Sequence, residues 1–238
     1  MTTRLLPDID LARIAPQRDD MKRKSLEQMK GGFSSITYNP VRACFSDIFN
    51  IQPDLDLGPA EPTPWAVIEA ELRKRSRSDD EFTFNRRVAL GLHDFASSGR
   101  VYGRKQEFFP LSMGMGQKIT LWLPMILAID EQASALFIEP RRTRGLTAEG
   151  RRFAFSMMHE RIRAADEDFA DVRLTIVQFG DPSDDRRAVR LHTDDGVELY
   201  SREELEQMVA STYEMWREVL EERERKARGR ATGTGPLI

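Results

Sequence analysis

The spacing of apolar residues changes along this chain, and that change constrains the fold more than any other feature. Over residues 79–97 apolar side chains recur every three or four positions; they include Phe84, Val88, Leu92 and Phe95. This spacing is typical of a helix with one buried face. Beyond residue 106 the apolar residues fall instead into short runs, which are typical of buried strands. The chain therefore combines helices with a sheet.

Helix start signals place two helices around these runs. Ser78 is followed three positions later by Glu81, a capping-box pattern that predicts a helix from about residue 79. Thr147 is a suitable N-cap for a second helix, which we expect to end near residue 165. The strands predicted from the apolar runs cover 106–113, 118–129, 135–139 and 172–179. The second and third of them should form a hairpin, which gives the core order α-β-β-β-α-β.

The C-terminal part adds a hairpin and a helix to this core. Residues 188–192 and 197–200 flank a Thr-Asp-Asp-Gly turn signal. Ser201 and Glu204 form a second capping box, and apolar positions continue in helical spacing to about residue 225. We therefore expect an α/β protein of the α+β type: a mixed β-sheet flanked by helices, with an extra C-terminal hairpin and a long helix.

The distribution of proline and glycine predicts the domain organisation. Residues 1–60 carry five prolines and a Gly-Gly pair, so we expect a poorly structured N-terminal extension. Residues 61–226 should form a single α/β core domain. The last residues, 227–238, are rich in glycine and arginine and predict a disordered tail.

Charge and cysteine content restrict the class of protein. The 238 residues include 36 basic and 39 acidic side chains, a net charge of -3. Global charge therefore argues neither for nor against nucleic acid as a binding partner. A single cysteine, Cys44, cannot form an internal disulfide, which fits a reducing compartment. The sequence predicts neither a signal peptide nor the run of about 20 apolar residues that spans a bilayer. We expect a cytoplasmic protein without membrane contact.

Arginine is concentrated just before and within the second predicted helix. Five arginines, with Glu149 as the only acid among them, fall within residues 141–152: Arg141, Arg142, Arg144, Arg151 and Arg152. Guanidinium groups bind phosphate in bidentate fashion, and a helix N-terminus adds free N–H groups. We therefore interpret Arg142, Arg144, Arg151 and Arg152 as a phosphate-binding site. The alternative is a solvated face paired with acids elsewhere in the chain.

Two acids at the ends of the predicted hairpin strands form a second candidate. Asp130 and Glu139 would supply oxygen ligands to Mg²⁺ or Mn²⁺ if the hairpin brought them together. Arg141 lies two positions after Glu139, on the same face of an extended strand, where it would hold a phosphate beside the metal. The alternative is a hairpin end that carries two solvated acids.

The order of elements over residues 79–179 resembles the core of the PD-(D/E)XK nuclease-like superfamily. Asp130 matches the family's strand aspartate, and Glu139-Pro140-Arg141 matches its (D/E)-x-K motif with arginine in place of lysine. The resemblance implies metal-dependent cleavage of nucleic acid, with Asp130, Glu139 and Arg141 as catalytic residues. It also implies an assisting acid on the first helix, for which both Glu81 and Asp94 are candidates.

Other catalytic motifs are incomplete. Gly114-x-Gly116 lacks the third glycine of a dinucleotide fingerprint, and His159-Glu160 lacks the second histidine of a zinc protease motif because position 163 is Arg163. The sequence thus favours a nucleic-acid-associated protein. The alternative is a protein-interaction or regulatory module without catalysis, which would bind a protein partner or a second copy of itself. A third possibility is an enzyme with a small anionic substrate.

Overall fold

The computed structural model describes residues 5–29, 36–52, 61–98, 101–114, 116–141, 143–183 and 185–231. Its helices are α1 (Asp8–Ile14), α2 (Asp19–Glu27), α3 (Asn39–Ala43), α4 (Phe45–Ile48), α5 (Trp65–Arg75), α6 (Asp79–Ser98), α7 (Ala148–Met158) and α8 (Arg202–Ala231). A π-helical turn (His159–Arg163) and a 3₁₀ turn (Glu167–Phe169) follow α7. The strands are β1 (Ile51–Gln52), β2 (Tyr102–Lys105), β3 (Leu111–Met113), β4 (Gln117–Ile119), β5 (Met125–Ile129), β6 (Gln132–Ile138), β7 (Arg173–Ser183) and β8 (Arg186–Thr193).

A mixed sheet forms the centre of the described fold, with strand order β1-β2-β5-β6-β7-β8. Strands β2, β5 and β6 pair antiparallel, and β6 and β7 pair parallel through the α7 crossover. The expected order α-β-β-β-α-β is therefore present as α6-β2-β5-β6-α7-β7, and the expected α+β fold class is confirmed. A small antiparallel pair, β3–β4, interrupts this order between β2 and β5.

Three strand predictions need correction. The first core strand is β2, whereas the end of the predicted 106–113 strand belongs to the small sheet. The predicted 118–129 strand is divided into β4 and β5, because residues 120–124, which include Pro124, leave the strand conformation. The C-terminal hairpin joins β7 to β8, and residues 197–200 form no strand.

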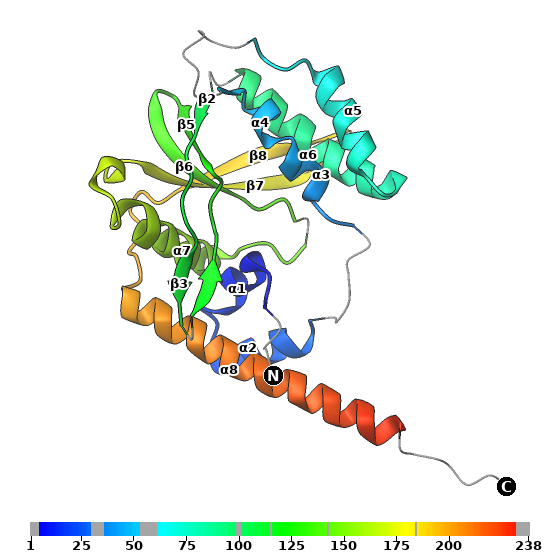
Figure 1. Ribbon diagram of the computed structural model, residues 1–238, viewed down its shortest axis with the longest axis vertical. Coiled ribbons are helices and arrows are strands. Elements are labelled where there is room, and N and C mark those ends of the chain that lie inside the picture. Colours follow the sequence, from blue (N-terminus) through cyan, green and yellow to red (C-terminus); the bar gives the residue numbers. More distant parts are fainter. Residues whose placement is uncertain are drawn as a thin grey trace, which may run out of the picture.

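Two layers of helices cover the two faces of the sheet (Figure 1). Helices α3 to α6 cover one face, where Val88, Leu92 and Leu136 belong to one apolar core. Helices α1 and α7 lie on the other face, where Phe153 and Phe137 belong to a second core, and α8 packs outside them. The side chains of β6 contribute alternately to the two cores, because successive side chains of a strand point to opposite faces.

The described parts of the N-terminal region, residues 5–29 and 36–52, belong to the fold, contrary to the expected poorly structured extension. Leu11 and Ile14 of α1 are fully buried against the second core, and Phe49 after α4 is fully buried in the first. Helix α2 packs on α8, where Lys22 Nζ donates to Ser211 Oγ at 2.9 Å. Helices this short are stable only through tertiary packing, so their local sequence signal is weak.

The C-terminal boundary is closer to the one predicted from the sequence. Helix α8 continues to Ala231, past the expected end near residue 225, and residues 232–238 of the predicted tail lie outside the described residues. Within the part of the chain that the structure describes, no helix combines the length and apolarity needed to cross a membrane.

Candidate functional site

The structure does not bring Asp130 and Glu139 together. Asp130 and Glu131 are the central residues of the β5–β6 turn, with φ of 50° and 65°. Glu139 follows the far end of β6, and the length of this strand separates the two acids by roughly 20 Å. A single metal ion therefore cannot contact both. The described residues contain no cluster of three or more His, Cys, Asp or Glu side chains arranged for a metal ion.

Glu139 and Arg141 do lie together, as their spacing predicted, but they bind each other. The Arg141 guanidinium donates to both carboxylate oxygens of Glu139, with Nε–Oε1 at 2.9 Å and Nη2–Oε2 at 3.3 Å. Its Nη1 donates to Asp10 Oδ1 at 2.7 Å. Glu139 is 1% exposed, and this burial raises the pKa of its carboxyl despite the opposing effect of Arg141. The trio joins the end of β6 to α1.

The predicted phosphate-binding arginines diverge. Arg142 lies outside the described residues. Arg144 is exposed on the loop before α7, with a φ of 56°. Arg151 donates to Gln178 Oε1 at 3.2 Å, whereas Arg152 stacks at 3.8 Å over the ring of Tyr200. Two of the four therefore have internal contacts on different sides of α7.

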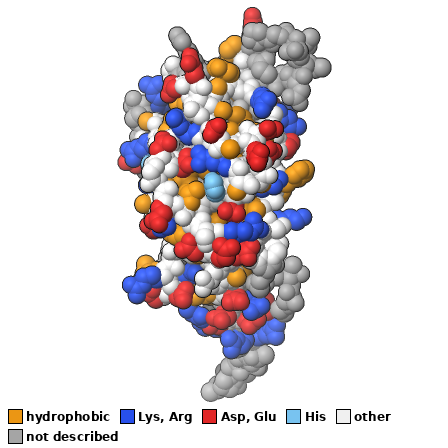
Figure 2. Space-filling model, turned by 90° about the vertical axis from the view of Figure 1, so that its left-hand side faces the viewer, with side chains coloured by type: hydrophobic (Ala, Val, Ile, Leu, Met, Phe, Trp, Pro, Cys, Tyr) orange, Lys and Arg blue, Asp and Glu red, His pale blue; other side chains and the backbone are white. Residues whose placement is uncertain are grey.

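Sequence reasoning missed two residues near Arg151, an arginine and a histidine. Strand β8 places Arg190 opposite Gln178, and His192 lies two positions further along. Burial lowers the pKa of His192, and the charges of Arg151 and Arg190 lower it further. Elsewhere the charges are mixed: Figure 2 shows a face on which cationic and anionic side chains are interspersed.

Both candidates for an assisting acid have structural partners. Glu81 is 1% exposed, and its carboxylate accepts from the backbone N–H groups of Thr37 and Arg77, each at 2.8 Å. The side-chain hydrogen bond from Arg77 is the largest of several that lower the pKa of Glu81. Asp94 pairs with Arg186 at 2.6 Å.

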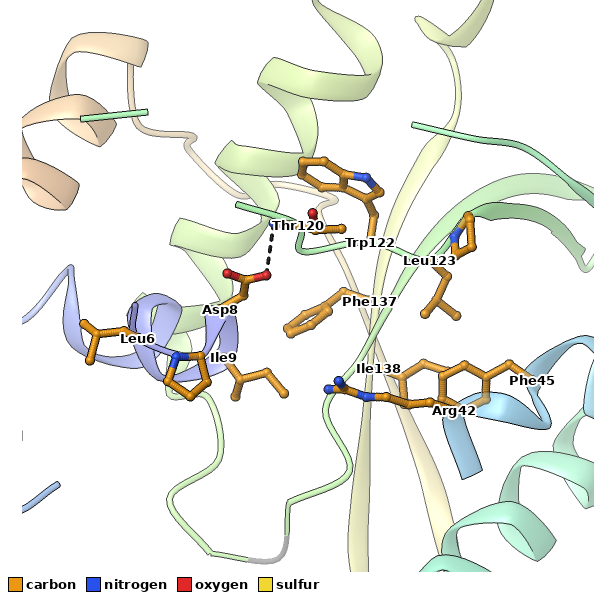
Figure 3. A pocket seen from close by; sticks show the side chains of 12 residues that line it. Leu6, Asp8, Ile9, Arg42, Phe45, Thr120, Trp122, Leu123, Phe137 and Ile138 are labelled. Carbon is orange, nitrogen blue, oxygen red and sulfur yellow. Dashed lines mark hydrogen bonds between the residues drawn. The ribbon is translucent and has the colours of Figure 1, made fainter. Parts of the chain in front are cut away.

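A cavity of about 540 Å³ lies beside the Glu139–Arg141 pair. Segments distant in the sequence line it: α1 and the residues before it, α3 and α4, the link between β4 and β5, and the end of β6 (Figure 3). Most of the lining is apolar, and the aromatic part consists of Phe45, Trp122 and Phe137. The cavity lies where the two apolar cores meet, since Phe137 belongs to one and Phe45 to the other.

Asp8 and Arg42 are the two charged side chains of this cavity, and Figure 3 shows them on different sides of it. Asp8 Oδ2 accepts from the backbone N–H of Thr120 at 3.1 Å. Burial raises the pKa of Asp8, while that hydrogen bond and the charge of Arg42 oppose the shift. Arg42 is exposed to solvent as a whole residue, yet partial desolvation of its guanidinium lowers its pKa, opposed by the charges of Asp8 and then Glu139. Both residues lie in the segment expected to be poorly structured, so sequence reasoning missed them.

Comparison with known proteins identifies the family. A family model described as "Sliding clamp-binding bacterial toxin SocB" matches residues 9–226. The DNA replication inhibitor toxin SocB of Caulobacter vibrioides (strain NA1000 / CB15N) is 38% identical over 231 residues, which are 97% of this chain and 95% of that protein. No solved structure matches the chain. The family match begins within α1 and includes α2 to α7, the whole sheet and most of α8, and the chain belongs to the SocB family of sliding clamp-binding bacterial toxins.

Proposed function

We propose that this protein binds a bacterial sliding clamp and inhibits DNA replication, and that it does so as an interaction protein without catalysis. The observation that carries the proposal is the 38% identity, over 97% of the chain, to a protein named as a DNA replication inhibitor toxin. Because the identity extends over nearly the whole length of both chains, the two proteins share the complete described fold. The partner would then be a protein of the replication machinery, and we expect the protein to act in the cytoplasm.

The arrangement of the acidic side chains supports an interaction protein over a nuclease. Asp130 is exposed on a turn, whereas Glu139 is bound by Arg141 at the other end of the strand. The resemblance to the PD-(D/E)XK superfamily therefore rests on element order, without the paired acids that its chemistry requires. A replication inhibitor of this kind would act by occupying its partner.

The surface offers several exposed apolar side chains where a partner could bind. Phe109 is 74% exposed, Leu5 60%, Tyr102 58% and Val67 57%. Aromatic side chains are over-represented among the residues that dominate binding energy at interfaces. Phe109 also has the Arg161 guanidinium 5.7 Å from its ring centre. Phe109 and Tyr102 are therefore the first residues to test.

The direct experiment measures binding of the purified chain to the sliding clamp of its own organism by calorimetry. We expect binding in the micromolar range or tighter, together with inhibition of clamp-dependent DNA synthesis on a primed template. Absence of binding at about 100 μM clamp, where ΔG° would be weaker than about −5.5 kcal/mol, would refute the proposal. A parallel assay with labelled DNA and Mn²⁺ tests cleavage, and metal-dependent cleavage would restore the nuclease hypothesis.

Substitutions then locate the binding surface. If Phe109 or Tyr102 is central, its replacement by alanine weakens clamp binding by at least about tenfold. Leu191→Ala is the matched control, because Leu191 is 39% exposed on the edge strand β8. Hydrogen exchange with and without the clamp covers the whole chain, including residues 53–60, which carry Leu55 and Leu57 and lie outside the described residues.

A second proposal retains contact with nucleic acid, without cleavage. It is supported by the guanidinium groups of Arg151 and Arg190, both close enough to act on His192, with Arg144 exposed on the loop before α7. Phosphate contacts of this kind weaken steeply as salt rises, because each neutralised phosphate releases counterions. Loss of salt-sensitive DNA binding in Arg144→Gln/Arg151→Gln would support it, and an unchanged affinity would refute it.

A further inference from the structure

The cavity between α1 and the end of β6 has the size and lining of a small-molecule site. Its volume of about 540 Å³ falls within the range of known ligand pockets, roughly 300–1,000 Å³. The walls include Phe45 and Ile138 from one core and Phe137 from the other, so an apolar body placed there would contact both. Known pockets likewise combine apolar walls with a few placed polar groups.

The two charged groups at this cavity are held apart. Asp8 and Arg42 form no ion pair within 4.0 Å of each other, and Arg42 forms none with any other described residue. The nearby Glu139 and Asp10 are both bound by Arg141. The cavity therefore presents one carboxylate and one guanidinium, each partly desolvated and each with capacity for a further partner.

The pair of opposite charges restricts the charge of a ligand. An uncharged apolar molecule would desolvate both groups further without replacing their hydrogen bonds to water, which is costly. A simple anion would face Asp8, and a simple cation would face Arg42. A molecule with both charges satisfies both groups, and its hydrogen bonds to charged partners are the stronger kind.

We propose that this cavity binds a small zwitterion with an apolar body, whose carboxylate pairs with Arg42 and whose ammonium group pairs with Asp8. Aromatic amino-carboxylates, whose two charges lie at opposite ends of the ring, belong to this class. The proposal does not depend on clamp binding, and occupation of the cavity would stabilise the junction between the two apolar cores.

The test uses the full chain without the clamp, so its result is independent of the proposed function. Three probes share one aromatic body: 4-(aminomethyl)benzoate is a zwitterion, 4-methylbenzoate an anion and 4-methylbenzylamine a cation. We expect the zwitterion to bind at least about tenfold more tightly than either singly charged probe, measured by ligand-observed NMR and by thermal shift.

Two variants test which residue recognises which charge. Asp8→Asn keeps an oxygen that can accept from Thr120, and it should bind the anion better than the zwitterion. Arg42→Gln should bind the cation better than the zwitterion. The matched controls are Asp20→Asn and Arg18→Gln, because the side chains of Asp20 and Arg18 are 69% and 90% exposed and do not line the cavity. Circular dichroism and the melting temperature verify that each variant is folded.

The outcomes separate clearly. A zwitterion preference that reverses in the two cavity variants and persists in the two controls would establish the site. No binding of any probe to the wild type at about 5 mM, where ΔG° is weaker than about −3 kcal/mol, would refute it. A wild type that prefers a singly charged probe, or cavity variants with unchanged preferences, would also refute it.

Discussion

Replacement of Glu81 by glutamine should destabilise the protein because this carboxylate joins three parts of the chain. It lies in the first turn of α6 and accepts from Thr37, in the residues before α3, and from Arg77, in the link after α5. The substitution retains the size of the side chain and one accepting oxygen. It removes the charge and turns the second oxygen into a donor that faces the backbone N–H of Arg77, 2.8 Å from Oε2 in the wild type.

The expected loss is about 2 kcal/mol in the free energy of unfolding. A hydrogen bond to a charged group contributes about 1.5–3 kcal/mol, and a buried N–H without an acceptor costs about 1–3 kcal/mol. We take a low value because the Arg77 side chain is 58% exposed, so solvent screens its ion pair with Glu81. For a chain of this size, 2 kcal/mol corresponds to a melting temperature lower by about 4–8 °C.

The loss should depend on pH. The hydrogen bonds lower the pKa of folded Glu81, so its stabilisation is fully present above the unfolded pKa of about 4.3 and is lost as the pH falls toward the folded value. Urea unfolding of wild type and Glu81→Gln at pH 7 and pH 3 measures this. Asp80→Asn, which removes an exposed charge from the same helical turn, is the control. A difference below about 0.5 kcal/mol at pH 7, or one equally large at pH 3, would contradict the reasoning.

Three further predictions follow from the packing and from the separated acids. Gly91→Ala should lower the free energy of unfolding by at least about 2 kcal/mol, because an added Cβ would lie 2.0 Å from the Arg187 carbonyl oxygen; chemical denaturation measures it, and a change below about 0.5 kcal/mol would contradict it. Millimolar Mn²⁺ should leave the melting temperature within about 1 °C, since Asp130 and Glu139 lie too far apart to share an ion; a larger rise that Glu139→Ala abolishes would show a metal site. Asp194→Ala should lower the free energy of unfolding by about 2 kcal/mol, because both Asp194 carboxylate oxygens accept from the Arg163 guanidinium and one also accepts from the backbone N–H of Leu174 in β7. Thermal unfolding measures the change, and an unchanged melting temperature would exclude this role.

Local signals predicted the helix starts well. Ser201 and Glu204 form the predicted capping box in full: each backbone N–H donates to the other's side chain, at 2.7 and 3.2 Å. At Ser78 only half of the motif forms, because the Glu81 carboxylate binds Arg77 and Thr37 instead. A capping box depends on residues that are close in the sequence, which is why the sequence is informative about helix starts.

The turns were harder to place, and the candidate site depended on them. The β5–β6 turn has positive φ at Asp130 and Glu131, although two-residue hairpin turns favour Asn and Gly at such positions. The sequence therefore predicted a later turn, which brought Asp130 too close to Glu139. The cavity was missed for a different reason: Asp8 and Arg42 come to line one cavity only through tertiary packing, which no local pattern records.

The apolar core that joins the first and last helices has a consequence for synthesis. Leu11 of α1 and Val219 of α8 belong to the same core, so this core joins residues that are separated by most of the sequence. At the usual ribosomal rate of about 5–20 residues per second, the first helix waits about 10–40 s for its partner. Throughout that interval the nascent chain exposes apolar surface that chaperones and proteases can bind. The yield of folded protein therefore depends on how the chain is handled before its last helix is made.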